Sequence, residues 1–345
     1  MDETPKNTIN IEQVVTEVLN SIEREREREI ISRRFGLFDR KETLEQIGEL
    51  LGITRERVRQ LEKAVVNKLR ITAMENKLAN IENAQKALKE ELVKVGGVAR
   101  IQSLSTKIGR EANRIDQSRI AFIAELSPKL VVLGDSDDFY HVIGIKSVHD
   151  IKKIKSMVSE IIETIKKIEG PETIDKIAIS MNSNDPMQLA ALASTSKQLA
   201  TLNGRWGLTI WPMVNPKNIR DKIYVILKEN GKHMHFNEIA ESIKSSSFKR
   251  KDVTTQAIHN ELIKDKRFVL IGRGIYALKE WGYEKGTVAD IITDVLKKSK
   301  EPLHRDEIVK RVLKSRYVKE TTILLNLQGK PQFKRVAKAT YALAK

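Results

Sequence analysis

Residues 43–70 read TLEQIGELLGITRERVRQLEKAVVNKLR. Thr43, followed three residues later by Gln46, has the form of a capping box and predicts that a short helix begins here. Gly52 supplies a tight turn, and Thr54 is placed to cap a second helix. Two helices joined by so short a turn are typical of a helix-turn-helix.

The second helix has two chemically distinct faces. Its apolar positions recur at helical spacing and predict a buried stripe of Val58, Leu61, Val65 and Leu69. The opposite face carries Arg55, Glu56, Arg59, Gln60 and Lys63. Arginine can bind guanine bidentately, glutamate can accept from the cytosine amino group, and glutamine can pair with adenine, so this face suits the major groove. Arg57 and Lys63 are better placed to bind phosphates. The alternative is an ordinary solvated amphipathic helix.

A further helix is predicted upstream. Apolar residues recur on one helical face from Ile11 to Ile22, and the alternating Glu and Arg residues of 23–29 are predicted to continue that helix with a solvated surface. The sequence Phe35-Gly36-Leu37 then breaks it. The apolar face is either plain core or a surface for a partner.

Residues 25–70 closely resemble region 4 of the primary sigma factors of bacterial RNA polymerase. The resemblance is carried by Arg34-Phe35-Gly36-Leu37, Thr43-Leu44, Ile47-Gly48 and the run from Gly52 to Gln60. It implies that Arg55, Glu56 and Gln60 read a −35 promoter element, and that Thr43, Arg57 and Arg59 contact the DNA backbone. It also implies that the preceding helical layer, within residues 11–70, binds the flap of the polymerase β subunit.

The sequence departs from complete sigma factors in its aromatic residues. Those proteins hold melted promoters open with an aromatic-rich segment before region 4, because exposed rings stack on unpaired bases. Here the only aromatic residues in positions 1–121 are Phe35 and Phe38. We therefore expect that the chain lacks its own promoter-melting region.

The rest of the sequence contains internal repeats. His235-Phe-Asn-Glu-Ile239 recurs as His304-Arg-Asp-Glu-Ile308, and Tyr276-Ala-Leu278 recurs as Tyr341-Ala-Leu343. Weaker repeats precede them and indicate four units. The predicted domains are a helix-turn-helix module at 1–70, a connecting helix plus a winged helix at 71–145, and winged helices at 146–212, 213–283 and 284–345.

The third unit shows the plan of these units most clearly. Three helices are predicted at 219–229, 236–245 and 253–264, followed by a hairpin of 268–271 and 275–278 around Gly272-Arg273-Gly274. Residues 217–345 resemble HARE-type winged helices, which also form the folded part of the RNA polymerase delta subunit. The predicted fold class is mainly α with small β wings, a sigma region 4 helix-turn-helix followed by tandem winged helix-turn-helix domains.

The distribution of charge favours a polyanionic partner for the array. The chain of 345 residues has 62 Lys and Arg against 46 Asp and Glu, a net charge of +16. Residues 1–70 balance to zero, whereas residues 213–345 hold about +14. Possible nucleic-acid contacts in the array are Lys251, Arg273, Lys334 and Arg335.

Several classes of chemistry find no support in the sequence. There is no cysteine, no nucleotide-binding fingerprint and no nucleophile elbow. The histidines lack partners at ligand spacing, and His235 and His304, which stand at equivalent repeat positions, are predicted to cap or pack helices. We expect no enzyme activity, no metal and no cofactor. Without a leader or a long apolar run, the sequence predicts a cytoplasmic protein with no membrane partner.

The leading hypothesis is a sigma-factor-like transcription initiation or regulatory protein that binds double-stranded promoter DNA and the RNA polymerase core. The alternative is a delta-like protein that associates with polymerase and has little sequence-specific DNA binding. A third hypothesis, an accessory to a nuclease or modification enzyme, rests on fold analogy alone.

Overall fold

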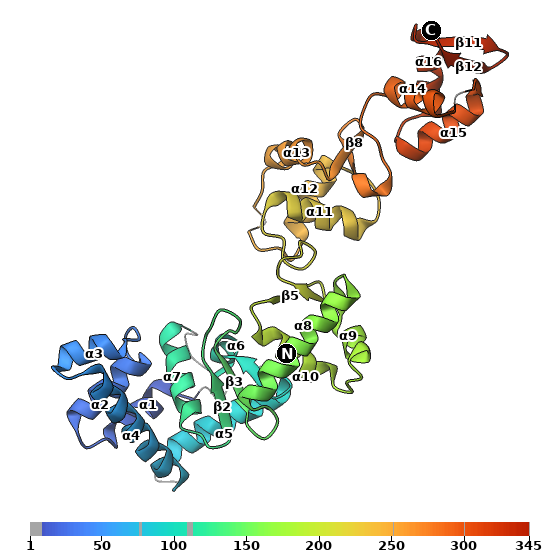
Figure 1. The fold of residues 1–345 in the computed structure, drawn as a ribbon. Coiled ribbons are helices and arrows are strands. Elements are labelled where there is room, and N and C mark those ends of the chain that lie inside the picture. The colour runs from blue at the N-terminus through green and yellow to red at the C-terminus, as the bar shows by residue number, and fades with distance from the viewer. Residues whose placement is uncertain (1–8, 76–77, 109–112, 251, 300, 345) are drawn as a thin grey trace, which may run out of the picture. The chain divides into compact units, whose positions relative to one another are not determined.

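The computed structural model describes residues 9–75, 78–108, 113–250, 252–299 and 301–344 (Figure 1). The chain divides into two compact units, Met1–Thr209 and Ile210–Lys345. The described residues hold sixteen α-helices and four three-stranded sheets, all antiparallel. The predicted fold class, mainly α with small β wings, is confirmed.

Four helices make up the N-terminal module: α1 (Ile11–Asn20), α2 (Glu25–Phe35), α3 (Leu44–Leu51) and α4 (Arg55–Met74). The predicted signals at their ends are confirmed. Thr43 forms the capping box with Gln46, Gly52 ends α3 in the left-handed conformation, and the hydroxyl of Thr54 accepts from the backbone N–H of Arg57.

One prediction about this module is wrong. The helix that begins at Ile11 does not continue through residues 23–29, because α1 ends at Asn20 and α2 begins at Glu25. The hydroxyl of Ser21 donates to the carbonyl of Val18 at 2.6 Å, and the chain turns so that Ile22 is buried. Arg28, in α2, then donates to the Ile22 carbonyl at 3.0 Å. The break therefore keeps Ile22 in the core while α2 takes a new direction.

The helix-turn-helix depends on a close backbone approach at Gly48. A Cβ at this position would lie 2.7 Å from the carbonyl oxygen of Ile53 and 3.4 Å from the nitrogen of Arg55. The start of α4 therefore lies directly against α3, where only glycine fits without displacement. Helix α4 ends at Met74.

The same topology then occurs four times. Each winged unit runs as a helix, a short strand, two helices and a two-stranded hairpin, and its first strand pairs with its third. The first winged unit comprises α5 (Ala79–Lys94), β1 (Val98–Arg100), α6 (Ile101–Ile108), α7 (Arg114–Glu125), β2 (Leu130–Leu133) and β3 (Val142–Ile145). The second comprises α8 (Ile151–Ile168), β4 (Glu172–Thr173), α9 (Ile174–Ser180), α10 (Pro186–Thr195), β5 (Leu199–Leu202) and β6 (Arg205–Leu208).

The two remaining winged units lie in the C-terminal compact unit. The third comprises α11 (Ile219–Asn230), β7 (Met234–His235), α12 (Phe236–Ser245), α13 (Thr255–Lys264), β8 (Phe268–Gly272) and β9 (Ile275–Leu278), followed by a 3-10 turn at Lys279–Trp281. The fourth comprises α14 (Val288–Ser299), β10 (Leu303–His304), α15 (Arg305–Ser315), α16 (Glu320–Gly329), β11 (Phe333–Ala337) and β12 (Thr340–Leu343).

The region after residue 70 is organised differently from the prediction. We expected a connecting helix, but α4 ends at Met74 and α5 is the first helix of the first winged unit, where it packs on α1, α6 and α7. The N-terminal module has only a small core of its own, formed by Ile30, Ile47 and Val58 with partly buried Leu44, Leu51, Ile53 and Leu61. The other buried apolar residues of the module join the core of the first winged unit.

This larger core is shared by α1, the C-terminal half of α4, and α5 to α7 with β2 and β3. Val15 and Val18 on α1 are almost fully buried, as is Leu69 on α4. The rings of Phe35, at the end of α2, and Phe122, on α7, lie 4.8 Å apart. The apolar face of α1, for which the sequence left two interpretations, is therefore core.

Candidate nucleic-acid interface

Helix α4 presents the predicted polar face to solvent. Arg55, Glu56, Arg59, Gln60 and Lys63 are all exposed. Val58, Val65 and Leu69 are buried on the other side, and Leu61 is half-buried. The N-cap at Thr54 and the close approach at Gly48 fix the first turn of α4 on α3. The module therefore holds a rigid helix whose outer face is polar.

Glu56 is the centre of the contacts on this face. The guanidinium of Arg59 donates to it twice, from Nε to Oε2 at 2.8 Å and from Nη2 to Oε1 at 2.7 Å. Gln60 donates to the same carboxylate at 3.3 Å. The hydrogen bonds from Arg59 lower the pKa of Glu56 to about 2. Glu56 is thus held as a carboxylate that can accept further hydrogen bonds, for example from a cytosine amino group.

The other predicted contact residues of α4 are held more loosely. Arg55 lies 4.0 Å from Glu45 of α3, and both side chains are exposed. The guanidinium of Arg57 lies 3.5 Å from the amide oxygen of Gln60. Lys63 forms no ion pair with any described residue. These cations can swing toward a DNA backbone without breaking a buried contact.

Thr43 has a structural task in addition to the predicted one. Its hydroxyl oxygen accepts from the backbone N–H of Gln46 at 3.2 Å, and its own N–H donates to the side chain of Gln46 at 2.9 Å. The residue closes the first turn of α3, so substitution affects the helix as well as any contact with DNA.

The third helices of the first two winged units pack against other parts of the chain, so they cannot enter a DNA groove. Helix α7 packs on α1 and α2 and buries both apolar and charged side chains, including Asp116 and Arg119. Helix α10 packs on β1 of the preceding unit and buries Leu189, Ala191, Leu192, Ala193 and Thr195. Sequence reasoning missed this, although the apolar run Ile120–Ala124 and the small residues of α10 were signals of close packing.

Polar contacts fasten the second winged unit to the first. Arg100 donates to the carbonyl of Ser194, and its guanidinium lies 3.7 Å from the centre of the Tyr140 ring. The N–H of Tyr140 donates to the carbonyl of Thr195 at 2.9 Å. A Cβ on Gly96 would lie 2.9 Å from the backbone of Gln188. These contacts make the first two winged units a tandem within the N-terminal compact unit.

The predicted array contacts lie on separate hairpins of the C-terminal compact unit. Arg273 is exposed in the turn between β8 and β9. A Cβ on the adjacent Gly274 would lie 2.5 Å from the ring of His235, so this turn lies tightly on the start of α12. Lys334 and Arg335 are exposed on β11. Lys251 lies outside the described residues.

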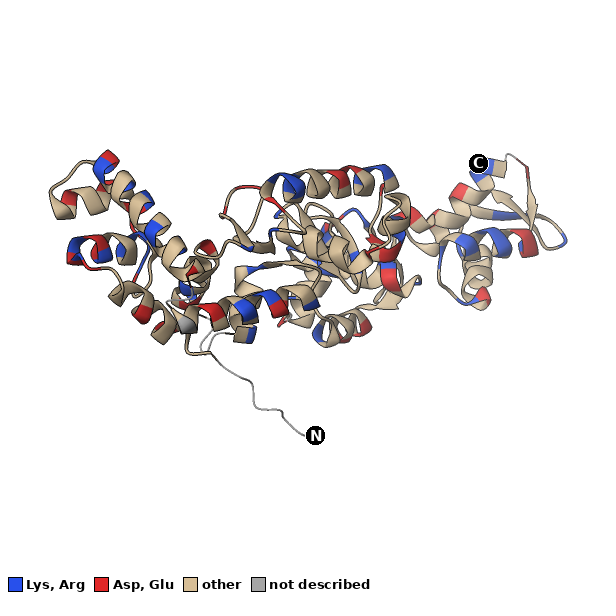
Figure 2. Cartoon of the chain, turned by 90° about the horizontal axis from the view of Figure 1, so that it is seen from below, with Lys and Arg blue, Asp and Glu red and all other residues tan. Residues whose placement is uncertain are grey.

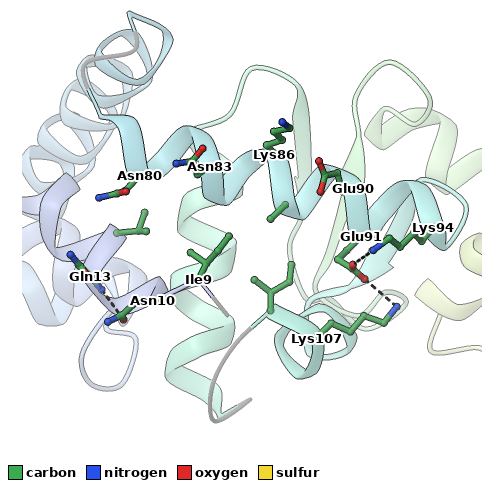
Figure 3. Close-up of a pocket in the computed structure, with 13 residues that line it drawn as sticks. Ile9, Asn10, Gln13, Asn80, Asn83, Lys86, Glu90, Glu91, Lys94 and Lys107 are labelled. Atoms are coloured by element: carbon green, nitrogen blue, oxygen red, sulfur yellow. Dashed lines mark hydrogen bonds and ion pairs between the residues drawn. The ribbon is translucent and has the colours of Figure 1, made fainter. Parts of the chain in front are cut away.

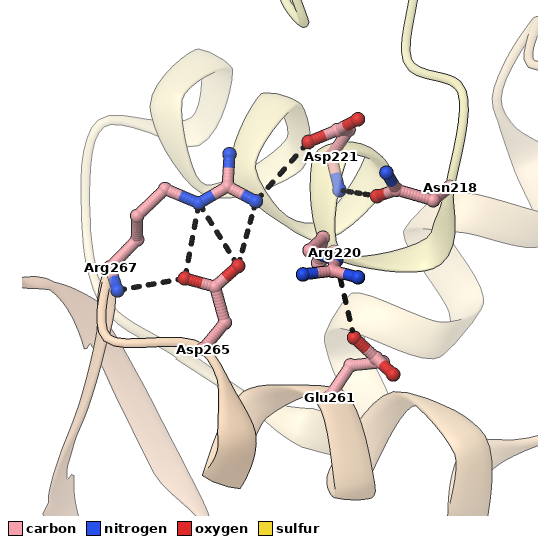
Figure 4. Close-up of polar contacts among 6 residues, drawn as sticks. All are labelled: Asn218, Arg220, Asp221, Glu261, Asp265 and Arg267. Carbon is pink, nitrogen blue, oxygen red and sulfur yellow. Dashed lines mark hydrogen bonds and ion pairs between the residues drawn. The ribbon is translucent and has the colours of Figure 1, made fainter.

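Two arginines near the base of the third hairpin form ion pairs with carboxylates of the same winged unit (Figure 4). Arg267, just before β8, donates to Asp265 at 2.8 Å and to Asp221 of α11 at 3.2 Å, and these hydrogen bonds raise its pKa. Arg220 lies 3.6 Å from Glu261. Both cations are therefore engaged in ion pairs that hold α11 against the hairpin and α13.

A polar groove of about 780 Å³ lies between α1, α5 and α6 (Figure 3). In it Glu91 accepts from Lys94 at 2.5 Å and lies 3.6 Å from Lys107, and the hydrogen bond from Lys94 lowers the pKa of Glu91. Asn80, Asn83 and Gln13 line the end that is nearer α1. The groove combines amides with paired charges and has no acid–base or nucleophile arrangement among its lining residues.

The histidines of the repeats serve the local structure. The rings of His235 and His304 accept from the backbone N–H groups of Asn237 and Asp306, and both residues cap helices. His233 lies 4.4 Å from the ring of Tyr317. Among the described residues, no group of three or more His, Cys, Asp or Glu side chains is placed to hold a metal ion. None of the described helices is both long enough and apolar enough to span a bilayer.

Comparison with known proteins identifies the N-terminal module. The family described as "Sigma-70, region 4" matches residues 24–70, which cover α2, α3 and most of α4 and leave α1 outside the match. The chain is 40% identical over 72 residues to "RNA polymerase sigma factor SigA" of Nostoc sp. (strain PCC 7120 / SAG 25.82 / UTEX 2576), which covers 20% of this chain and 18% of that protein.

Two further relatives are also sigma factors. "RNA polymerase sigma factor RpoD" of Helicobacter pylori (strain ATCC 700392 / 26695) is 54% identical over 48 residues, 13% of this chain and 7% of that protein. "RNA polymerase sigma factor sigB" of Arabidopsis thaliana is 44% identical over 61 residues, 17% of this chain and 11% of that protein. The chain spans less than a fifth of the length of these curated relatives.

Proposed function

We propose that this chain is a sequence-specific DNA-binding protein of transcription initiation, which reads a −35-type promoter element with α4 and binds RNA polymerase. The observation that carries the proposal is the exposed face of α4, with Glu56 held as a carboxylate by Arg59, within the segment that matches sigma-70 region 4. A carboxylate held on the exposed face of a helix can accept a hydrogen bond from a cytosine amino group.

The proposed roles follow from position on α4. Arg55, Glu56 and Gln60 face the base edges, with Arg59 keeping Glu56 in place from the next turn. Arg57, Arg59 and Lys63 meet phosphates on either side of the groove. Thr43, at the start of α3, contributes its backbone cap and a hydroxyl at the edge of the same surface.

Polymerase binding is proposed through the outer faces of α2 and α3. The apolar face of α1 is covered by the first winged unit, so a flap of the β subunit would have to bind elsewhere on the module. Leu50, on α3, is 55% exposed and Phe38, after α2, is 45% exposed. Exposed apolar residues beside charged helices suit a protein contact.

A delta-like role as a polymerase-associated interaction protein is the second candidate. It is supported by the burial of α7 and α10, because two winged units already use their third helices for protein packing. In this view the division into five domains, at 1–70, 71–145, 146–212, 213–283 and 284–345, with HARE-type units at the C-terminal end, serves to recruit proteins.

The two candidates are separated by selecting binding sites from random duplexes with the full chain and with Arg55→Ala, Glu56→Ala and Gln60→Ala. We expect each substitution to relax the preference at one or two base pairs by about 1–3 kcal/mol. Lys68→Ala is the control, because Lys68 is exposed on α4 beyond the proposed reading residues. Equal weakening on all sequences would contradict base reading. Polymerase capture that survives all three substitutions, without any preferred site, would favour the second candidate.

A further inference from the structure

The hairpin of the fourth winged unit projects beyond its core. Strand β11 is an edge strand, because the order in its sheet is β10-β12-β11. Phe333 is buried, but every residue from Lys334 to Ala337 is exposed. By contrast β8, the equivalent strand of the third unit, buries Phe268, Val269 and Ile271. Both faces of the outer part of β11 are therefore open to solvent.

The projecting hairpin carries cations without partners. Residues 333–343 contain Lys334, Arg335 and Lys338 and no Asp or Glu, and Lys330 precedes them at the end of α16. None of these four side chains forms an ion pair with a described residue. Their only hydrogen bond within the described part of the chain is local and runs from Arg335 to the carbonyl of Ala337. In Figure 2, blue segments, which mark Lys and Arg, lie near the C-terminus.

The other three hairpins have different charges. The first has Asp135, Asp137 and Asp138 between its strands and no Lys or Arg over residues 130–145. The second and third each contain a single cation, Arg205 and Arg273. Residues 284–345, which contain the fourth unit, hold 15 Lys and Arg against 7 Asp and Glu, a net charge of +8. Among the four hairpins, unpaired positive charge is thus concentrated on that of the fourth winged unit.

The arrangement of these cations fits a duplex better than an acidic protein surface. Successive strand residues point to opposite faces, so Lys334 and Arg335 extend to opposite sides of the hairpin. A bulge between Arg335 and Ala337 and a left-handed residue, Ala339, at φ 54° then bring Lys338 to the turn. An acidic protein patch would meet one side, whereas the minor groove, about 6 Å wide, has phosphates along both walls.

We propose that the β11–β12 hairpin binds duplex DNA across the minor groove without regard to sequence. Lys334, Arg335 and Lys338 meet phosphates of both strands, and Val336, 49% exposed between them, lies toward the groove. The contact is independent of the proposed promoter reading by α4. It adds affinity that depends on salt and carries no sequence information.

The test uses the full chain, a duplex of random sequence and a series of salt concentrations. Replacing Lys334, Arg335 and Lys338 with Gln should make the slope of log K against log salt shallower by about 3, because each phosphate contact contributes about 0.9. The matched control replaces three exposed α8 lysines that form no ion pair with a described residue: Lys152, Lys155 and Lys167. Both variants lose the same net charge, and thermal unfolding checks that each is folded.

The slope of log K against log salt should be shallower for the hairpin variant than for wild type, and the control variant should keep the wild-type slope. In addition, netropsin, which occupies the minor groove, should weaken binding of the wild-type chain more than binding of the hairpin variant. Equal slopes in the hairpin variant and wild type, or an equal loss in the α8 control, would overturn the proposal. Neither result would affect promoter reading, which is tested separately by the base preference of the α4 variants.

Discussion

The guanidinium of Arg119, on α7, donates a 2.8 Å hydrogen bond to the carbonyl of Leu37, which lies 82 residues earlier in the turn after α2. Another nitrogen of the same guanidinium lies 3.0 Å from Glu12 of α1 and 3.5 Å from Asp116. The side chain of Arg119 is only 10% exposed. A single arginine of the first winged unit thus joins two parts of the N-terminal module.

Removing this arginine should destabilise the N-terminal compact unit. Arg119→Met leaves Asp116 buried without this partner and the Leu37 carbonyl without its donor, which should cost about 3 kcal/mol of unfolding free energy. Urea unfolding of the full chain measures the change. Arg114→Met, at an exposed position of the same helix, is the control and should change stability by less than about 0.5 kcal/mol. Similar losses in both variants would contradict the role of the buried contacts.

Gly48→Ala should disturb the helix-turn-helix. The added Cβ would lie 2.7 Å from the Ile53 carbonyl, so α3 and α4 must separate, at a cost of about 1–3 kcal/mol. DNA binding should weaken with it, because the start of α4 is displaced. Gly134→Ala is the matched control, since no atom lies within 4 Å of a Cβ there and its φ is not positive. Unchanged stability and binding in Gly48→Ala would show that the close approach is unimportant.

The base preference due to Glu56 should stay the same when the pH is lowered from neutral to 4.5. Because the folded pKa is about 2, below the usual 4.5, the Glu56–Arg59 pair persists as the pH falls through 4.5 and is lost only as the pH approaches 2. Binding-site selection at pH 4.5 should therefore give the same preference as at neutral pH. In Arg59→Ala the carboxyl loses its main hydrogen-bond donor, so the preference should weaken at pH 4.5. Equal acid sensitivity of wild type and Arg59→Ala would contradict the proposed clamp.

Residues 1–75 alone should not form a stable domain. Cutting the chain there exposes the buried faces of α1 and the C-terminal half of α4, and leaves only the small core around Ile30, Ile47 and Val58. We expect this fragment to bind a hydrophobic dye and to unfold without a cooperative transition, whereas residues 1–209 should unfold cooperatively. A cooperative transition in the short fragment would show that the shared core is dispensable.

Sequence reasoning succeeded where the signal is local. The capping box of Thr43, the turn at Gly52 and the cap at Thr54 depend on residues within one turn, and the hairpin of the third winged unit follows from a glycine-rich turn between apolar runs. The break at Ser21 was missed because the apolar period continues through Ile22, so periodicity alone cannot place the end of α1.

The contacts between distant segments could not be predicted. The burial of α7 depends on α1 and α2, and that of α10 on β1, but one sequence does not indicate which apolar faces meet. The network around Glu56 joins neighbours one turn apart, so its members were predicted by spacing, whereas the strength of the Arg59 clamp required geometry. The DNA-contact roles of these residues stay predictions.

The core shared by α1, α4 and the first winged unit affects how this protein can be recombined. A promoter-reading module with a closed core of its own could be exchanged between proteins as a cassette. Here the core is shared, so a junction between two proteins would have to lie after the first winged unit. Because α10 of the second winged unit packs on β1 of the first, a junction after the second unit would preserve more contacts. Chimaeras that carry α4 into another protein should therefore bring α5 to α7 with it, and changes in α7 should be constrained by those in α1.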